Sequence, residues 1–296
     1  MSVPQRIAIS GSSGLIGTAL VGHLKSEGHT VQRLVRRAPV AADEVQWDPQ
    51  TGYVDLSALE GVDAVIHLAG VGVGDKRWTK RYKSEILNSR LMGTTTIAKA
   101  VAELKPQVFI SASAIGWYGE SGNRAVIETD RVGDDFLAAV CREWEAAADL
   151  AGDVRTVKIR TGLVLDPTGG ALGKMLPLFR LGFGGKLGSG KQWWSWITLH
   201  DVVRAISFSL EKNISGPVNL TTPNPVTNQE FTAALARAMK RPALFPAPAI
   251  ALKIALGGFS SEVLGSKKVM PSVLSDAGFQ WDYPHISTAL QALTEH

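Results

Sequence analysis

The stretch Ile7-Ala8-Ile9-Ser10-Gly11-Ser12-Ser13-Gly14-Leu15-Ile16-Gly17 decides the fold. A short apolar run enters three glycines spaced G-x-x-G-x-x-G, and an amphipathic helical pattern from Leu15 to Leu24 follows at once. A strand, a glycine-rich turn and a helix N-terminus in this order are typical of a dinucleotide pyrophosphate site, because the glycines let the backbone approach the phosphates and the free N–H groups bind them. The predicted cofactor contacts here are Gly11, Ser13, Gly14, Leu15, Ile16 and Gly17.

Apolar segments with strand character alternate with helical patterns along the first part of the chain. The predicted strands after the first are 30–37, 45–47, 63–70, 107–111 and 155–160, and the long helical patterns run from about 78 to 104 and from 134 to 151. Continuous apolar strands that alternate with helices favour a parallel, doubly wound sheet. The predicted fold class is therefore α/β, a Rossmann sheet with a smaller α-rich C-terminal lobe.

The character of the sequence changes after Gly162. A glycine-rich stretch with a short helix at 171–181 is followed by Trp193-Trp194-Ser195-Trp196, a helix that opens near Asp201, and a proline-broken helical tail. We predict a cofactor-binding domain over 1–165, completed by 196–225. The remainder, 226–296 with the 166–195 loop, forms a smaller substrate lobe.

Composition excludes several classes of protein. The 296 residues carry a net charge of only +4, and no run of Lys and Arg resembles a nucleic-acid-binding arm. Cys141 is the single cysteine, so the chain has no internal disulfide, and no run of about 18 apolar residues is present. Scattered histidines give no metal-ligand spacing. We expect a cytoplasmic protein with a small-molecule substrate and without a metal, a nucleic-acid partner or a membrane partner.

The end of the second predicted strand indicates which dinucleotide binds. NAD enzymes usually carry an acidic residue there, for the ribose 2′-hydroxyl, whereas this chain has Val35-Arg36-Arg37. A guanidinium pairs with a 2′-phosphate, which favours NADP, and we expect Arg36 to make the contact. Leu68, Ala69 and Gly70 end the fourth strand at the same edge, so their backbone is expected to line the ribose side of the cofactor.

Several motifs resemble those of extended short-chain dehydrogenases/reductases, the nucleotide-sugar epimerase group. They are the glycine spacing, His67-Leu68-Ala69-Gly70, the stretch from Ser111 to Gly119, Arg160-Thr161-Gly162, and Gly188-Ser189-Gly190 leading into the tryptophans. Over nearly its whole length the chain looks like the atypical "epimerase family" subgroup that includes short-chain dehydrogenase family 39U. Members of the wider family commonly dimerise through two helices packed as a four-helix bundle, so the resemblance makes a homodimer one alternative for the assembly.

The chain departs from active epimerases at the residues that move the proton. The wider family uses a Ser or Thr, a Tyr-x-x-x-Lys pair and an Asn. When Glu145 is set on the family's glutamate four residues past the Lys, Cys141 falls at the Lys and Leu137 at the Tyr, while Arg90 takes the place of the Asn. Ser113 remains as the candidate catalytic serine.

Other residues are candidates for the missing roles. Tyr118 is the second catalytic candidate, because it follows Ser113 at the mouth of the sheet and carries a phenol; the alternative is a packed aromatic. Cys141 would act as an acid only with a lowered pKa. The resemblance implies cofactor contacts from Glu85 and Arg90, with a surface ion pair as the alternative. The tryptophans either stack on a substrate or form a hinge.

Two functions remain open from the sequence. The first is an NADP-dependent oxidoreductase or epimerase-like enzyme of unknown substrate, supported by the intact cofactor motifs and Ser113. The second is a non-catalytic NADP(H)-binding sensor or regulatory module, supported by the missing Tyr and Lys.

Overall fold

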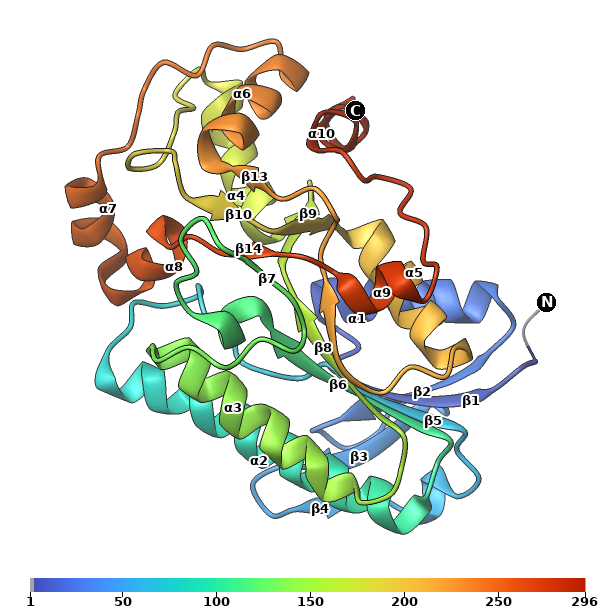
Figure 1. Cartoon of the computed structure of the whole chain (residues 1–296). Helices are drawn as coiled ribbons and strands as arrows, with labels where there is room; N and C mark the ends of the chain where they lie inside the picture. Colours follow the sequence, from blue (N-terminus) through green and yellow to red (C-terminus); the bar gives the residue numbers. More distant parts are fainter. Residues whose placement is uncertain (1–2, 296) are drawn as a thin grey trace.

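An eight-stranded sheet forms the centre of the molecule in a computed structural model that describes residues 3–295 (Figure 1). The strand order is β12 (Gly216–Leu220), β8 (Thr156–Thr161), β6 (Val108–Ala114), β5 (Ala64–His67), β1 (Arg6–Ser10), β2 (Thr30–Val35), β3 (Glu44–Asp48) and β4 (Tyr53–Val54). All neighbours are parallel except β3 and β4. The chain switches direction across the sheet at β1, between β2 and β5, which confirms the predicted doubly wound Rossmann fold.

Helices cover both faces of this sheet. The helices α1 (Leu15–Ser26) and α5 (Leu199–Glu211) contact each other on one face, and α2 (Lys80–Leu104) and α3 (Phe136–Ala148) on the other (Figure 1). Fully buried aliphatic residues of the strands, such as Ile9, Ile66 and Ile159, pack into the core beneath α1 and α5. Strands buried on both faces explain the continuous apolar runs in the sequence.

Two helix starts differ from the expected ones because a threonine caps each helix. The helix expected from Trp78 begins at Lys80, where the Thr79 hydroxyl accepts a hydrogen bond from the Tyr82 amide. The helix expected to open near Asp201 begins at Leu199, and its cap is Thr198, whose side chain accepts from the Asp201 amide. Asp201 itself therefore lies inside the first turn and is free to bond elsewhere.

A second apolar core lies beyond the carboxyl ends of the strands. It is built from β9 (Leu163–Asp166), α4 (Gly170–Arg180), β11 (Trp196–Thr198), α6 (Asn228–Ala238) and α10 (Ile286–Thr294), with Trp196 and Phe231 fully buried at its centre. The strands β9 and β11 pair in parallel, while β10 (Trp193–Trp194) pairs antiparallel with β13 (Val226–Thr227). These elements form the roof over the edge of the main sheet (Figure 1).

The remainder of the C-terminal region follows two courses. Residues 249–264 form α7 (Ala249–Leu256) and α8 (Ser260–Leu264), and no residue of α7 is buried. The chain then returns to the main sheet as β14 (Lys268–Val269), which pairs with β7 (Ala125–Val126), and as α9 (Ser272–Asp276). Leu274 and Phe279 belong to the core of the main sheet, so part of the tail packs with the cofactor domain. Among residues 3–295, no helix has the length and apolar character needed to cross a membrane.

Candidate functional site

The glycine turn leaves room for a phosphate group only because its glycines lack side chains. Gly11 has a φ of +72°, and a Cβ placed there would lie 2.7 Å from the Ala69 amide nitrogen. A Cβ on Gly17 would overlap the carbonyl oxygen of Gly11. The helix α1 starts after Gly14 with no capping side chain, so its first amides are open to an anion. This geometry fits a dinucleotide pyrophosphate.

The two arginines that follow β2 have different partners. Arg37 donates two hydrogen bonds to the Glu44 carboxylate, at 2.8 and 2.6 Å. Those bonds hold the pKa of Glu44 down at about 2. Arg36 is exposed and forms no hydrogen bond or ion pair through its side chain with any residue in the described range 3–295. Arg36 is therefore the guanidinium that is available to a ligand.

Arg90 lies beside the end of β5 and carries a charge without a carboxylate partner in the described part of the chain. Its Nη1 donates to the carbonyl oxygens of Val71 and Ile86, at 2.9 and 3.1 Å. The guanidinium sits over the ring of Trp144, 4.7 Å from its centre, and packs under Gly70. Burial lowers the pKa of Arg90. A partly buried cation that only carbonyl groups and a ring compensate among the described residues attracts an anionic ligand.

Glu85 lies one turn before Arg90 but points to other partners. Its carboxylate pairs with Arg81 at 3.2 Å and with Lys76 at 3.8 Å, and its side chain is 38% exposed. It does not line the cavity described next. The structure thus brings Arg90 to the candidate site and places Glu85 in a surface ion pair, which was the alternative for this residue.

A cavity of about 740 Å³ lies between the carboxyl edge of the sheet and the roof. Its floor is formed by residues 113–116 and 161–163, one wall by α3, and the opposite side by the roof with α4, α7 and α8. Most of its lining is apolar. The charged side chains at its wall are Asp75, Arg90, Lys174, Glu262 and Lys267, of which the last two form an ion pair at 3.0 Å. This position, at the carboxyl ends of the strands, is where open α/β sheets bind their ligands.

Ser113 stands at the floor of the cavity and is held by a buried ion pair. Its hydroxyl donates to Glu145 Oε1 at 2.7 Å. The same carboxylate receives two hydrogen bonds from Arg160, at 2.8 and 2.9 Å, and all three side chains are nearly inaccessible to solvent. Burial opposes the charge on Arg160, but its hydrogen bonds to Glu145 prevail and raise the pKa of Arg160. Since the Ser113 proton points at Glu145, the lone pairs of its oxygen are left for a ligand.

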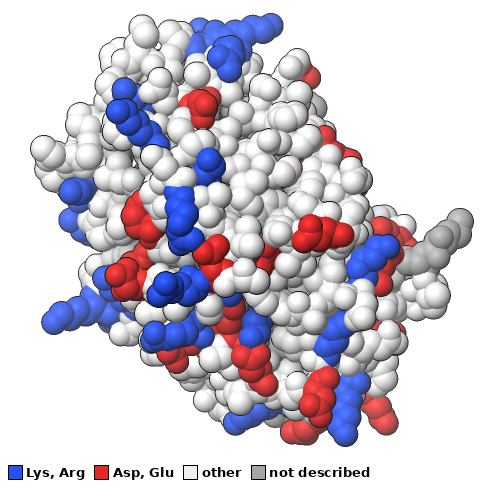
Figure 2. Space-filling model, viewed as in Figure 1, with Lys and Arg blue, Asp and Glu red and all other residues white. Residues whose placement is uncertain are grey.

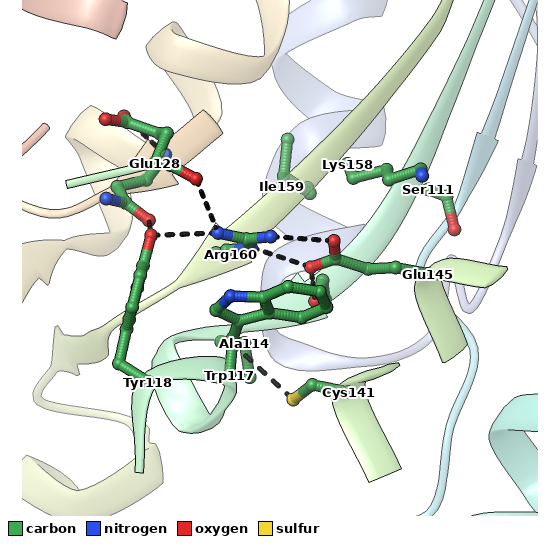
Figure 3. A network of polar contacts seen from close by, with 12 residues as sticks. Ser111, Ala114, Trp117, Tyr118, Glu128, Cys141, Glu145, Lys158, Ile159 and Arg160 are labelled. Carbon is green, nitrogen blue, oxygen red and sulfur yellow. Dashed lines mark hydrogen bonds and ion pairs between the residues drawn. The ribbon is translucent and has the colours of Figure 1, made fainter. Parts of the chain in front are cut away.

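Tyr118 belongs to the far side of this network and does not reach the cavity. Its hydroxyl donates to Asn219 Oδ1 at 2.7 Å and accepts from Arg160 at 3.0 Å (Figure 3). Burial raises the pKa of Tyr118 to about 12. The Glu128 carboxylate continues the network by accepting from the amides of Asn219, Ser272 and Val273. The structure therefore corrects the assignment of Tyr118 as a catalytic candidate: its phenol is a buried structural group.

Leu137 and Cys141, the replacements for the Tyr and Lys, both line the cavity. Cys141 is buried, and its thiol contacts the Ala114 carbonyl oxygen at 3.6 Å. Burial raises the pKa of Cys141 to about 12. The condition for an acidic thiol, a lowered pKa, is not met, and Cys141 serves as a small apolar wall residue.

The tryptophans divide between the cavity and the core. Trp193 and Trp194 line the cavity, whereas Trp196 is fully buried in the roof and donates to the Asn224 carbonyl oxygen. The hydroxyl of Ser195, between them, donates to the carbonyl oxygen of Lys267 and accepts from the amide of Val269. Two rings are thus available to a ligand, and the intervening serine joins the loop to the C-terminal segment.

One group of acidic and histidine side chains lies outside the cavity. His200, Asp201 and Asp282 approach within 4.8 Å of one another. Arg204 donates to Asp201 at 3.0 Å, and the amides of Asp282 and Tyr283 donate to the same carboxylate. These bonds occupy the carboxylate of Asp201, so the group is an ion-paired junction that fastens the C-terminal segment to α5.

Sequence reasoning missed the residues that complete the site. One signal in the sequence pointed to the Glu145–Arg160 pair. Glu145 stands at an inward-facing position of a helix and Arg160 at an inward-facing position of a buried strand, where unpaired charges are rare. Leu252 and Leu256 of α7 and Lys174 of α4 also line the cavity. They left no signal, since only the folding of the roof brings them to the sheet edge.

Comparison with known proteins identifies the family. The profile described as "NAD dependent epimerase/dehydratase family" matches residues 7–221, and a domain of unknown function, DUF1731, matches 247–293. An epimerase family protein of Mycobacterium tuberculosis is 46% identical over 96% of each chain. Human epimerase family protein SDR39U1 is 35% identical over 97% of this chain and 99% of its own. A crystal structure of the human protein with NADPH superposes with a TM-score of 0.92 at 33% identity, covering 98% of this chain and 99% of that chain. The chain belongs to the NAD-dependent epimerase/dehydratase family, as the sequence motifs predicted.

Proposed function

We propose that this protein is an NADP(H)-dependent oxidoreductase or epimerase-like enzyme that acts on a small molecule. The observation that carries the proposal is Ser113, whose hydroxyl is oriented by a buried ion pair at the floor of the cavity. The same cavity is lined by Arg90, a cation without a carboxylate partner within 3–295. An oriented hydroxyl beside an uncompensated charge, in an apolar cavity, is an arrangement suited to chemistry on a carbonyl or alcohol.

The residues present fit a dinucleotide phosphate. The turn from Gly11 to Gly17 would hold the pyrophosphate, Arg36 the 2′-phosphate, and the backbone of 68–70 with Arg90 the ribose nearer the cavity. The human relative was crystallised with NADPH, which supports NADP as the cofactor of this chain too. Bound there, the nicotinamide would supply or accept hydride at the cavity floor.

Ser113 has a defined part in this proposal. Because its proton is directed at Glu145, its oxygen accepts a hydrogen bond from a substrate hydroxyl and orients it. In the oxidising direction the substrate hydroxyl passes its proton to Ser113 as the serine proton moves to Glu145. Leu137 and Cys141, on the wall beside this floor, add apolar surface that excludes water from it.

The lobe formed by 226–296 with the 166–195 loop is the proposed substrate lobe, because α4, α7 and the tryptophan loop supply the cavity wall opposite the sheet. The single, buried, free thiol is compatible with a reducing compartment, and we propose a cytoplasmic location. The adjoining helices α2 and α3 are the surface on which a homodimer would form.

A screen of the NADPH-loaded protein against carbonyl compounds and nucleotide sugars tests the enzyme. Oxidation of the nicotinamide, followed by its absorbance, is expected for at least one class. Ser113→Ala should abolish turnover while NADPH still binds, and Ser84→Ala, on the exposed side of α2, is the matched control. Turnover that survives Ser113→Ala would refute the assigned role.

The non-catalytic NADP(H)-binding module is the second candidate. It is favoured by Leu137 at the cavity wall, where the wider family has its Tyr. It is also favoured by the pKa of about 12 for both Tyr118 and Cys141, which leaves neither as a ready proton donor. Tight NADPH binding with no turnover across the screen would support it.

A further inference from the structure

Large apolar side chains on the surface concentrate in two segments. Thirteen such residues are exposed among those described, and seven of them fall within 170–191 and 240–256. The seven are Leu178, Leu181, Phe183, Leu244, Phe245, Ile250 and Ile254, each between 53% and 74% exposed. We call the surface formed by 170–191 and 240–256 the rim surface. Exposed apolar groups gathered in this way mark an interaction site.

The two segments of the rim surface are adjacent in space. The amide of Phe245 donates to the carbonyl oxygen of Gly184 at 3.2 Å, and the amide of Ala247 to that of Lys186 at 2.9 Å. The rings of Phe183 and Phe245 lie 5.8 Å apart. The two segments therefore lie side by side where Phe183 and Phe245 are exposed.

All the charge on the rim surface is positive. The two segments contain seven basic residues and no Asp or Glu: Lys174, Arg180, Lys186, Lys191, Lys240, Arg241 and Lys253. None of the seven takes part in the ion pairs found among the described residues, which are formed by other side chains. In Figure 2 the upper part of the molecule, where Figure 1 places α4 and α6, is mostly white with blue groups and a red group among them, and most of the red groups lie lower down.

The helix α7 joins this surface to the cavity. With 100° between successive residues, Ile250 and Ile254 share one side of the helix, and Leu252 and Leu256 share the opposite side. The two leucines line the cavity, while the two isoleucines are 74% and 70% exposed. Leu178 of α4 does both, since it lines the cavity and is 53% exposed. The rim surface therefore adjoins the cavity through α4 and α7.

We propose that the rim surface binds the surface of an anionic lipid bilayer. Apolar side chains that project beside unpaired Lys and Arg are the pattern that inserts into the headgroup region and attracts acidic lipids. A second copy of this chain is disfavoured as the occupant, because a symmetric contact would bring two wholly positive surfaces together. The expectation of no membrane partner rested on the absence of a spanning segment, and binding at the interface needs none.

The placement also indicates a substrate class, a step that rests on the proposed function. The cavity walls are mostly apolar, and two of the helices that line the cavity, α4 and α7, also carry side chains that would enter the headgroup region. Lys174 stands at that wall as an exposed cation. An amphipathic carbonyl or alcohol, with an apolar body and a polar or anionic head, suits such a cavity and reaches it directly from the bilayer.

Vesicle co-sedimentation of the full chain tests the binding. The probes are vesicles of phosphatidylcholine alone and vesicles of equal parts phosphatidylcholine and phosphatidylglycerol. We expect binding to the second kind only, weakened by added salt. Ile250→Ser with Ile254→Ser should weaken binding at least about tenfold, since each buried methylene contributes about fourfold. Lys240→Glu with Arg241→Glu should weaken it at least about 25-fold, at about fivefold for each cation near the surface.

Two matched controls lie away from the rim surface. Val40→Ser removes an apolar side chain that is 80% exposed, and Lys99→Glu reverses an exposed charge on α2. Both should bind vesicles like the unaltered chain, and NADPH affinity should be unchanged in every variant. The proposal is overturned if anionic vesicles are not bound, or if the rim variants bind as the controls do. It is also overturned if the protein sediments as a dimer that the isoleucine variant dissociates. Vesicle binding without turnover on any compound would instead contradict the proposed enzymatic function and leave the proposed bilayer binding in place.

Discussion

Replacing Arg36 with alanine separates the two nicotinamide cofactors. Arg36 has no partner within the described residues, so it enters a complex without breaking an existing bond. A hydrogen bond between charged groups is worth about 1.5–3 kcal/mol, and a guanidinium can make two such bonds to one phosphate. Even with screening by solvent at this exposed position, the expected loss is therefore about 2–3 kcal/mol. That loss corresponds to about 30- to 150-fold weaker NADPH binding at 1.4 kcal/mol per factor of ten. NADH, which has no 2′-phosphate, should change less than about threefold.

Arg37→Ala is the matched control, because the neighbouring guanidinium is already committed to Glu44. Its removal should cost stability at the end of β2 and leave the preference for NADPH over NADH nearly intact. Fluorescence titration of each variant with both cofactors measures the four dissociation constants. Equal weakening of NADPH and NADH by Arg36→Ala, or a loss of preference in Arg37→Ala alone, would refute the assignment of the 2′-phosphate to Arg36.

Three further substitutions or conditions probe the fold beneath the site. Glu145→Ala strands a buried guanidinium and should lower the free energy of unfolding by about 3–5 kcal/mol in urea titrations, and a loss below about 1 kcal/mol would contradict the buried pair. Gly17→Ala places a methyl group against a backbone carbonyl of the turn, so NADPH affinity should fall at least about tenfold in a direct binding titration. Gly22→Ala, with open space at its Cβ, should bind normally and gain stability. Acid titration should show a loss of folding stability that is attributable to Asp43, whose pKa is held at about 2 by its bond to Arg33. The stabilisation by this carboxylate is complete above about pH 4 and disappears as the pH falls toward 2. If Asp43→Asn leaves the acid unfolding profile unchanged, that linkage is absent.

The order of the elements could be predicted from the sequence because each depends on local signals. The strand, glycine turn and helix at 7–24 use short-range sterics, and the apolar runs report burial on both faces of the sheet. The first residues of two helices, α2 and α5, were predicted less accurately than the order of the elements. Thr79 and Thr198 act as caps through their side-chain geometry, which hydrophobic spacing does not record.

Only part of the candidate site could be predicted by the same reasoning. Cofactor contacts follow from one continuous stretch, whereas the cavity joins Ser113, Lys174 and Leu252, which are far apart in the chain. Tyr118 shows the limit most clearly. Its place after Ser113 suggested a shared site, but the turn Ile115–Tyr118 carries it to the opposite side of Arg160. Adjacency in sequence gave the wrong neighbour there, and only the packed network reveals it.

The return of the C-terminal tail to the main sheet restricts how the molecule opens. The strand β14 pairs with β7, Ser195 bonds the segment at 267–269, and Glu128 holds the amides of Ser272 and Val273. These bonds join the roof to the sheet, so a wide hinge motion between the two would have to break buried hydrogen bonds. Passage of ligands is instead expected through local displacement of α7, a helix that lines the cavity and has no buried residue. Because the roof is fixed to the sheet, α7 is the segment whose movement would open the cavity.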